Sequence, residues 1–350
     1  MKHRIVELDA LRGIAAVFVV FFHFSIMAGS SSIFLRAGVT GVDLFFLISG
    51  YVIFMTLIKI KSGYEFIISR LLRLYPSYLV MMLITLGIIF IFRRTEMPDI
   101  KVILGNVTMM QPLFFVPNID DSYWTLTVEM QFYILMLILY LCGWLKQIER
   151  TGSIILTLII LYYLMASFFF ENSVVYITPR SLFPVISHFQ LFFAGILFYN
   201  ISMQGATWRR HSLLLACLLW TMFLFDKSGR AHFFIGLTTY GIMIGLYFFI
   251  FYLFALKKLG FLNFKLLLFL GNISYGLYLI HQEAGKILYG YILDSHLLQP
   301  ALARVLLFFL MIAIATAVTY SVEKPVRKLK KYLIKSAAVT VTPKYVDERI

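Results

Sequence analysis

Apolar runs of about 20 residues recur along the chain, and each can cross the roughly 30 Å hydrocarbon core of a bilayer as a helix. Only 14% of the residues are charged and 61% are hydrophobic, whereas soluble domains average roughly 25% charged. The pattern predicts an all-α, polytopic membrane protein. We expect ten spans, at about 8–28, 39–58, 76–92, 123–145, 153–170, 181–200, 212–226, 231–256, 266–290 and 301–322.

The first span has some features of a cleavable signal peptide, since Lys2 and Arg4 precede it and residues 28–30 are small or polar. Its apolar run is longer than the roughly 7–15 residues of a signal peptide, and Asp9 and Arg12 interrupt it. We therefore interpret it as a retained membrane span.

Lysine and arginine are unevenly divided between the two sides that ten spans define. With the N-terminus inside, 21 of them fall on the cytoplasmic side and nine on the other, and Arg12 lies within the first span. Cytoplasmic loops are enriched in Lys and Arg, so both termini are predicted to be cytoplasmic. The same bias accounts for the net charge of +14 without a nucleic acid partner.

We expect a single membrane domain over residues 1–335, followed by a short cytoplasmic tail over 336–350. The basic segment 322–335 is predicted to lie against anionic lipid headgroups. Cys142 and Cys217 both fall in apolar runs and indicate neither a disulfide framework nor a metal site. The seven histidines lack the close spacing of a zinc motif, so no metal is expected.

The first span carries Asp9, Arg12 and His23. Arg12 and His23 are eleven residues apart, which places them on one helix face, roughly 16 Å apart along the axis. Ionisable residues inside a membrane face protein or water, so this face should point into the bundle, with Arg12 near the cytoplasmic end. Two simpler interpretations stay open: Asp9 and Arg12 could form an ion pair that only fixes the helix end, and His23 could be a packing residue.

The predicted span directions place four side chains in the outer half of the membrane: His23, Asp43, Glu129 and His281, with Tyr278 one turn below His281. Periodicity does not establish that they touch. Asp43 could simply cap a helix N-terminus. A buried carboxylate such as Glu129 is costly without a partner, which favours a specific role for it.

A second polar layer is predicted at the cytoplasmic face. Arg70 and Arg73 lie three residues apart, and with Arg12 and Lys265 they could form a cationic mouth. Arginine forks suit phosphate, although ordinary cytoplasmic charge explains Arg70 and Arg73 equally well. A ligand with phosphates at this mouth and its reactive group near His23 must be long and thin, as coenzyme A is.

Six short motifs follow one another along nearly the whole chain. They are "LDALRG" (8–13) with His23 beyond it, "DLFFLISG" (43–50), "RLLRLYP" (70–76), "WTLTVEMQFY" (124–133), "SYGLYLIHQ" (274–282) and "VEKPVRK" (322–328). Together they resemble the motifs of acyltransferase family 3, bacterial membrane enzymes that O-acetylate surface glycans. Thr125 stands where that family usually has serine, which keeps the hydroxyl.

The resemblance implies an acetyl-CoA donor, a glycan hydroxyl as acceptor and the bacterial inner membrane as location. The acceptor would be a surface polysaccharide, a lipopolysaccharide O-antigen or an exopolysaccharide precursor, contacted by the loop 93–122. Some members carry an additional soluble hydrolase-like domain. This chain ends about 28 residues after its last predicted span, so none is expected here.

Roles for the candidate residues follow from combining the resemblance with the predicted depths. The CoA phosphates are expected at Arg12, Arg70 and Arg73. His23 would act as general base on the acceptor hydroxyl or take the acyl group as a nucleophile. Glu129 is the first candidate for the carboxylate that orients His23, and Asp43 is the second. The candidate donors to the developing oxyanion are Tyr278, Trp124 and His281.

Two functions without acyl transfer remain as alternatives. A transporter or flippase for a polysaccharide intermediate would suit ten spans with an internal polar track, although no inverted repeat is apparent. A scaffold for a glycan assembly complex would have little reason to bury His23 and Glu129 at one depth. Acetyl-CoA-dependent labelling of a glycan separates the three functions.

Overall fold

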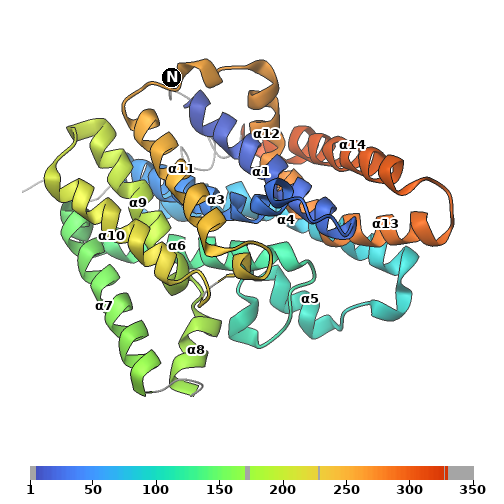
Figure 1. Cartoon of the computed structure of the whole chain (residues 1–350), viewed down its shortest axis with the longest axis horizontal. Helices are drawn as coiled ribbons and strands as arrows, with labels where there is room; N and C mark the ends of the chain where they lie inside the picture. Colours follow the sequence, from blue (N-terminus) through green and yellow to red (C-terminus); the bar gives the residue numbers. More distant parts are fainter. Residues whose placement is uncertain (1–4, 170–173, 228, 327, 330–350) are drawn as a thin grey trace, which may run out of the picture.

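A computed structural model describes residues 5–169, 174–227, 229–326 and 328–329, and these form helices joined by turns (Figure 1). The predicted all-α class is confirmed. The α-helices are α1 (Val6–Met27), α2 (Ile33–Arg36), α3 (Gly41–Leu57), α4 (Gly63–Phe92), α5 (Ile100–Val107), α6 (Trp124–Leu141), α7 (Ile148–Phe169), α8 (Val174–Leu182), α9 (Val185–Gln204), α10 (Trp208–Phe223), α11 (Leu237–Ala255), α12 (Lys265–Ile280), α13 (Glu283–Asp294) and α14 (Pro300–Val318).

Within the described residues, eight helical stretches are long and apolar enough to cross a membrane, in place of the ten predicted. They are Val6–Met27, Ile33–Leu57, Gly63–Phe92, Asp121–Leu141, Trp144–Phe168, Val185–Gln204, Leu237–Ala255 and Pro300–Val326. The other two predicted spans correspond to α10 and α12, which have 16 residues each. The structure thus supports a multi-pass membrane protein with fewer full-length spans than expected.

The predicted span 266–290 is wrong as one continuous helix. Helix α12 ends at Ile280, the chain turns, and α13 begins at Glu283. Two polar groups stabilise the break. The His281 ring donates to the carbonyl of Tyr278, and the carboxylate of Asp120 accepts a hydrogen bond from the first backbone N–H of α13. Hydropathy averaged over a long window did not reveal this turn, because apolar residues on either side outweigh the polar residues 281–283.

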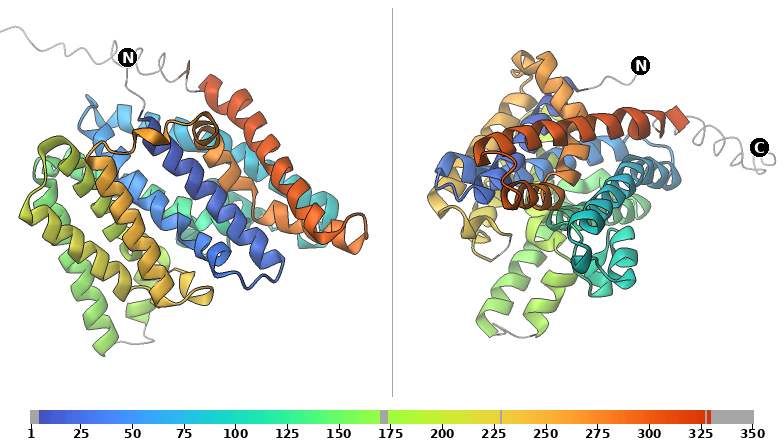
Figure 2. Two further views of the ribbon diagram at one scale, coloured as in Figure 1. Left: turned by 45° about the horizontal axis from the view of Figure 1, so that its top comes forward. Right: turned by 90° about the vertical axis from the view of Figure 1, so that its right-hand side faces the viewer.

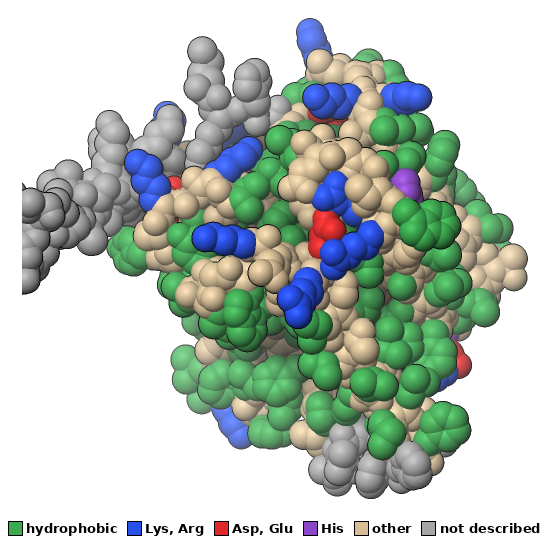
Figure 3. Space-filling model, turned by 90° about the vertical axis from the view of Figure 1, so that its left-hand side faces the viewer, with side chains coloured by type: hydrophobic (Ala, Val, Ile, Leu, Met, Phe, Trp, Pro, Cys, Tyr) green, Lys and Arg blue, Asp and Glu red, His purple; other side chains and the backbone are tan. Residues whose placement is uncertain are grey.

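The first residues of α1 and the last residues of α14 lie at the same end of the bundle (Figure 2). Lys and Arg side chains gather on this end (Figure 3), and Lys146, Arg150, Arg209 and Arg210 line a cavity on it. This is the charge distribution of a cytoplasmic face. The cytoplasmic location of the two termini stays a prediction. The tail 336–350 and half of the basic segment 322–335 lie outside the described residues.

Two pairs of helices approach closely through glycine. On α3, a Cβ atom at Gly50 would overlap the backbone carbonyl of Phe192 on α9. On α12, a Cβ at Gly271 would overlap the backbone carbonyl of Asp9 on α1. Small residues let membrane helices pack backbone to backbone. These contacts join α3 to α9 and α12 to α1, beside the polar residues described next.

Candidate active site

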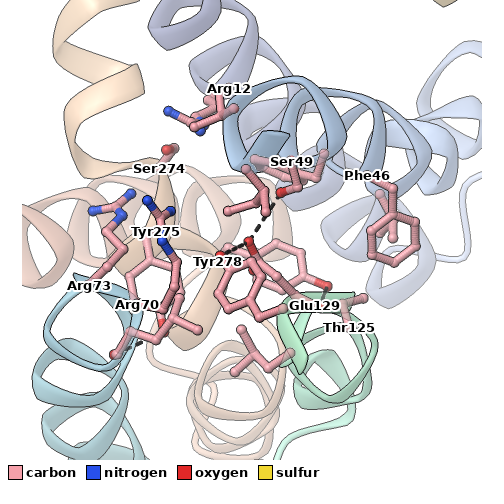
Figure 4. A pocket seen from close by; sticks show the side chains of 17 residues that line it. Arg12, Phe46, Ser49, Arg70, Arg73, Thr125, Glu129, Ser274, Tyr275 and Tyr278 are labelled. Atoms are coloured by element: carbon pink, nitrogen blue, oxygen red, sulfur yellow. Dashed lines mark hydrogen bonds between the residues drawn. The ribbon is translucent and has the colours of Figure 1, made fainter. Parts of the chain in front are cut away.

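A cavity with about 760 Å³ of empty volume lies between α1, α3, α4, α6 and α12. Figure 4 shows the side chains that line it. We call it the arginine cavity. Its polar lining residues are Arg12, Ser49, Arg70, Arg73, Thr125, Glu129, Tyr133, Ser274, Tyr275 and Tyr278. The structure therefore brings the three predicted arginines together, whereas Lys265 does not line this cavity.

The guanidinium groups gather on one side of the arginine cavity (Figure 4). Arg12 lies 3.4 Å from the carboxylate of Asp9, as the spacing of the two residues predicts. Arg70 donates to the hydroxyl of Thr56 at 3.2 Å and packs over the Phe66 ring, 5.5 Å from its centroid. Both arginines are thus held by a neighbour at the edge of the cavity.

Arg73 forms an ion pair with Glu323, whose side chain is 1% exposed. Glu323 ends the π-helical turn Thr319–Glu323 that follows α14, so the "VEKP" motif reaches the cavity wall through this pair. Sequence reasoning assigned no role to Glu323. The available signal was a carboxylate at the end of a long apolar run, where an unpaired charge would be costly.

Glu129 on α6 also lines the arginine cavity. Its carboxylate accepts hydrogen bonds from Ser49, at 3.1 Å, and from the hydroxyl of Tyr133. His23 lines a different cavity. Predicted depth placed Glu129 and His23 in one layer, but depth does not fix which face of α6 points to which helix. The structure groups Glu129 with the arginines.

A second cavity, the histidine cavity, adjoins the first and has about 1240 Å³ of empty volume. Its polar and aromatic lining residues include His23, Asp43, Asp121, Trp124, His188, Arg230, Tyr240, Tyr278, Gln282 and Lys286. Asp43 is 8% exposed and lines this cavity together with Tyr240. The structure thus brings His23, Asp43, Trp124 and Tyr278 to one cavity.

His281 is fully buried, and its ring centroid lies 5.0 Å from that of His23. Its Nδ1 lies 2.7 Å from the carbonyl oxygen of Tyr278. A carbonyl oxygen only accepts, so Nδ1 carries the proton. A neutral imidazole has one N–H, and here it is used. Neutral His281 therefore has no N–H left for an oxyanion, contrary to the donor role expected from the sequence.

Tyr278 lines both cavities. Its hydroxyl accepts a hydrogen bond from Thr125 at 2.9 Å and donates to the backbone oxygen of Ser122 at 3.3 Å. The hydroxyl of Thr125 thus takes part in the site, which supports the view that the replacement of serine at this position keeps its chemistry. Tyr278 joins α12 to the start of α6 at the point where the cavities meet.

The predicted loop 93–122 contains α5 and short 3-10 turns. Asp121 and Ser122 line the histidine cavity, and Pro112 and Asn118 line a third cavity of about 1270 Å³. We call it the outer cavity, after the side on which the sequence predicts this loop; it shares Trp124, His188, Gly229 and Arg230 with the histidine cavity.

Asp120 is a further buried polar residue that sequence reasoning missed. Its two carboxylate oxygens accept hydrogen bonds from the backbone N–H groups of Ser122, at 2.8 Å, and Glu283, at 2.9 Å. Burial, which outweighs these hydrogen bonds, raises the pKa of Asp120 to about 6. The available signal was the "DDSYW" stretch, where an acidic residue caps the turn before a helix.

Across the described ranges, no three His, Cys, Asp or Glu side chains are arranged to hold a metal ion. The two cysteines are free thiols. The polar groups that line the two cavities are arginines, imidazoles, carboxylates and hydroxyls.

The fold and the cavities define a multi-pass helical membrane protein with a cationic pocket beside an imidazole-bearing pocket. The family model Acyl_transf_3, an acyltransferase domain, matches residues 5–322. The chain belongs to this acyltransferase family, as its motifs indicated.

Curated relatives cover the chain to different extents. The O-acetyltransferase OatA of Staphylococcus aureus is 24% identical over 380 aligned positions, which cover 92% of this chain and 57% of the relative. The putative membrane-bound transacylase BcsY of Komagataeibacter xylinus is 31% identical over 155 residues, which cover 40% of this chain and 38% of the relative. The chain thus spans about half the length of these relatives or less. No solved structure gives a significant match.

Proposed function

We propose that this protein transfers an acetyl group from acetyl-CoA to a hydroxyl of a cell-surface glycan, within the bacterial inner membrane. The observation that carries the proposal is the adjacency of the arginine and histidine cavities, which share Val42 and Tyr278. A phosphate-bearing donor and a hydroxyl acceptor can then meet inside one bundle. The names of the relatives, an O-acetyltransferase and a transacylase, support the same class of reaction.

The arginine cavity is the proposed donor site. Arg12, Arg70 and Arg73 would bind the CoA phosphates, because planar guanidinium groups form paired hydrogen bonds to phosphate oxygens. The pantetheine arm would extend past Tyr278 and carry the thioester toward His23. The apolar lining residues between these points, such as Val42 and Phe45, suit a thin and weakly polar chain.

His23 is the proposed base or nucleophile. As a base, it accepts the proton of the acceptor hydroxyl while the oxygen attacks the thioester carbon, and the CoA sulfur leaves. As a nucleophile, it first takes the acetyl group and then passes it to the hydroxyl. An acetylated enzyme accumulates with donor alone only by the second route.

Two carboxylates and two donors complete the proposed site. Asp43, in the histidine cavity, is now the better placed candidate to stabilise a cationic His23. Glu129 lies with the arginines and would instead organise the Ser49 and Tyr133 hydroxyls near the donor. The Trp124 indole N–H is the first candidate for an oxyanion donor. The Tyr278 hydroxyl is the second, and its proton would have to turn from the Ser122 oxygen to the oxyanion.

The acceptor is proposed to enter through the outer cavity. Trp124 offers an aromatic face, and Asn118, Ser181 and His188 offer hydrogen-bonding groups, a combination that suits sugar rings. A lipid-linked or polymeric glycan would lie across the loop 93–122.

The function is tested by comparing surface glycan from cells with and without the gene. O-acetyl content should fall in its absence, and purified protein in liposomes should restore acetyl groups from labelled acetyl-CoA. Label that never reaches the glycan, together with altered export of unmodified glycan, would instead support a transporter.

A further inference from the structure

The Nε2 atom of the buried His281 can accept a hydrogen bond, but no donor in the described part of the chain is paired with it. Its Nδ1–H is used by the Tyr278 carbonyl, so in the neutral ring Nε2 carries a lone pair. Among the described residues, this Nε2 atom is buried and has no hydrogen-bond partner. A buried polar atom left unpaired costs about 1–3 kcal/mol. Such an atom beside a proposed catalytic residue suggests a partner that is engaged during the reaction.

The nearest imidazole is that of His23. The two ring centroids are 5.0 Å apart, with an angle of 60° between the planes. At this separation, a rotation of the half-buried His23 ring brings an N–H of that ring to His281. The His281 ring has no such freedom, because it is fully buried and its backbone hydrogen bond fixes it.

The backbone keeps the two rings together. His23 lies on α1, and His281 follows the last residue of α12. These helices touch where Gly13 meets Gly271: a Cβ atom at Gly13 would lie 2.6 Å from the backbone nitrogen of Gly271. On the α13 side of the turn, the carboxylate of Asp120 accepts a hydrogen bond from the Glu283 N–H. The orientation of His281 is therefore built into the fold.

We propose that His281 is a positioning residue that fixes the tautomer of His23 by accepting a hydrogen bond from it at Nε2. The inference rests on the proposed function. One His23 nitrogen donates to His281, so the other is left unprotonated and faces the histidine cavity as the base. In the Ser-His-Asp triad of hydrolases, a carboxylate fixes the tautomer of the catalytic histidine in the same way.

With this assignment, every bond and proton in the transfer step is accounted for. The acceptor oxygen forms a bond to the acetyl carbon as the thioester C–S bond breaks. The hydroxyl proton moves to the free nitrogen of His23, which becomes a cation held by His281. His23 then returns that proton to the CoA sulfur, which leaves as a thiol, and both histidines are neutral again.

The test compares two replacements of His281, with acetyl-CoA and the cell-envelope glycan fraction as the substrates. His281→Leu removes the acceptor, whereas His281→Gln keeps a side-chain oxygen that can accept from His23. We expect kcat to fall about 100-fold in the leucine variant, the scale of general base catalysis. The KM for acetyl-CoA should stay unchanged, and the glutamine variant should recover most of the lost kcat.

A thermal melt of each variant separates positioning from folding. Wild-type kcat in His281→Leu, or equal losses of kcat in both variants with equal losses of thermal stability, would overturn the inference. Absence of acetyl transfer in the wild-type protein would instead refute the proposed function. A second readout, without turnover, is the acetyl-CoA dissociation constant, which neither replacement should change.

Discussion

Val42 on α3 and Tyr278 on α12 both lie at the junction of the two cavities: of the described residues, these two line both. The Tyr278 hydroxyl is held by Thr125 and Ser122 at the start of α6. On the proposed path, a donor bound at the arginines reaches His23 by passing Val42 and Tyr278. The side chains of these two residues should therefore control access from one cavity to the other.

Replacing Val42 with Trp should block this junction. We expect acetyl transfer to fall at least about tenfold, because the indole would occupy space that the pantetheine arm needs, and forcing it aside costs about 1–3 kcal/mol. Binding of acetyl-CoA, measured by calorimetry, should change little. Val42→Ala is the matched control and should retain activity. A tryptophan variant that transfers acetyl groups at the wild-type rate would rule out this path.

Replacing Arg12 with Gln should weaken donor binding. A charge-assisted hydrogen bond contributes about 1.5–3 kcal/mol, so the dissociation constant for acetyl-CoA should rise by roughly 10- to 100-fold. Arg209→Gln removes a cation from the same end of the bundle but outside the arginine cavity, and should have little effect. Equal affinities for the two variants would remove Arg12 from the donor site.

Replacing Gly50 with Ala should destabilise the protein, because the added Cβ would overlap a backbone carbonyl of α9. Overpacking of this kind costs about 1–3 kcal/mol. A Cβ added at Gly87 on α4 would have no neighbouring atom within 4 Å, so Gly87→Ala is the matched control. Melting in detergent should show a lower midpoint for the first variant only. Equal midpoints would mean that α3 and α9 are not in backbone contact at Gly50.

Asp120 should make stability depend on pH. Its pKa is raised from 3.8 to about 6 by burial, so the folded state binds the proton more tightly than the unfolded state. The contribution of Asp120 to the free energy of unfolding is therefore fully present below about pH 4. It falls by up to about 3 kcal/mol as the pH rises through about 6.

The comparison is between wild type and Asp120→Asn, melted at about pH 4 and about pH 7. The stability of the wild type relative to the variant should be greater at the lower pH. The half-exposed neighbour Asp121 provides the control, Asp121→Asn. A wild-type advantage that is the same at both pH values would show that Asp120 keeps an ordinary acidity.

Sequence patterns predicted the class of fold and the gathering of Arg12, Arg70 and Arg73, because hydropathy, helical spacing and side-chain charge are local properties. They could not predict that Glu129 and His23 line different cavities, since that depends on how α6 is rotated against α3 and α4. Hydropathy also failed at His281, where α12 ends and the ring bonds the Tyr278 carbonyl, because it merged the apolar residues before and after this turn into one span.

The central claim is that acetyl transfer occurs at His23. The most direct measurement is transfer of labelled acetyl from acetyl-CoA to the envelope glycan by purified protein in liposomes, wild type against His23→Ala. We expect the variant to bind acetyl-CoA normally, to melt like the wild type and to transfer at least about 100-fold more slowly. Near-normal transfer by the His23→Ala variant would rule out His23 as the base or nucleophile.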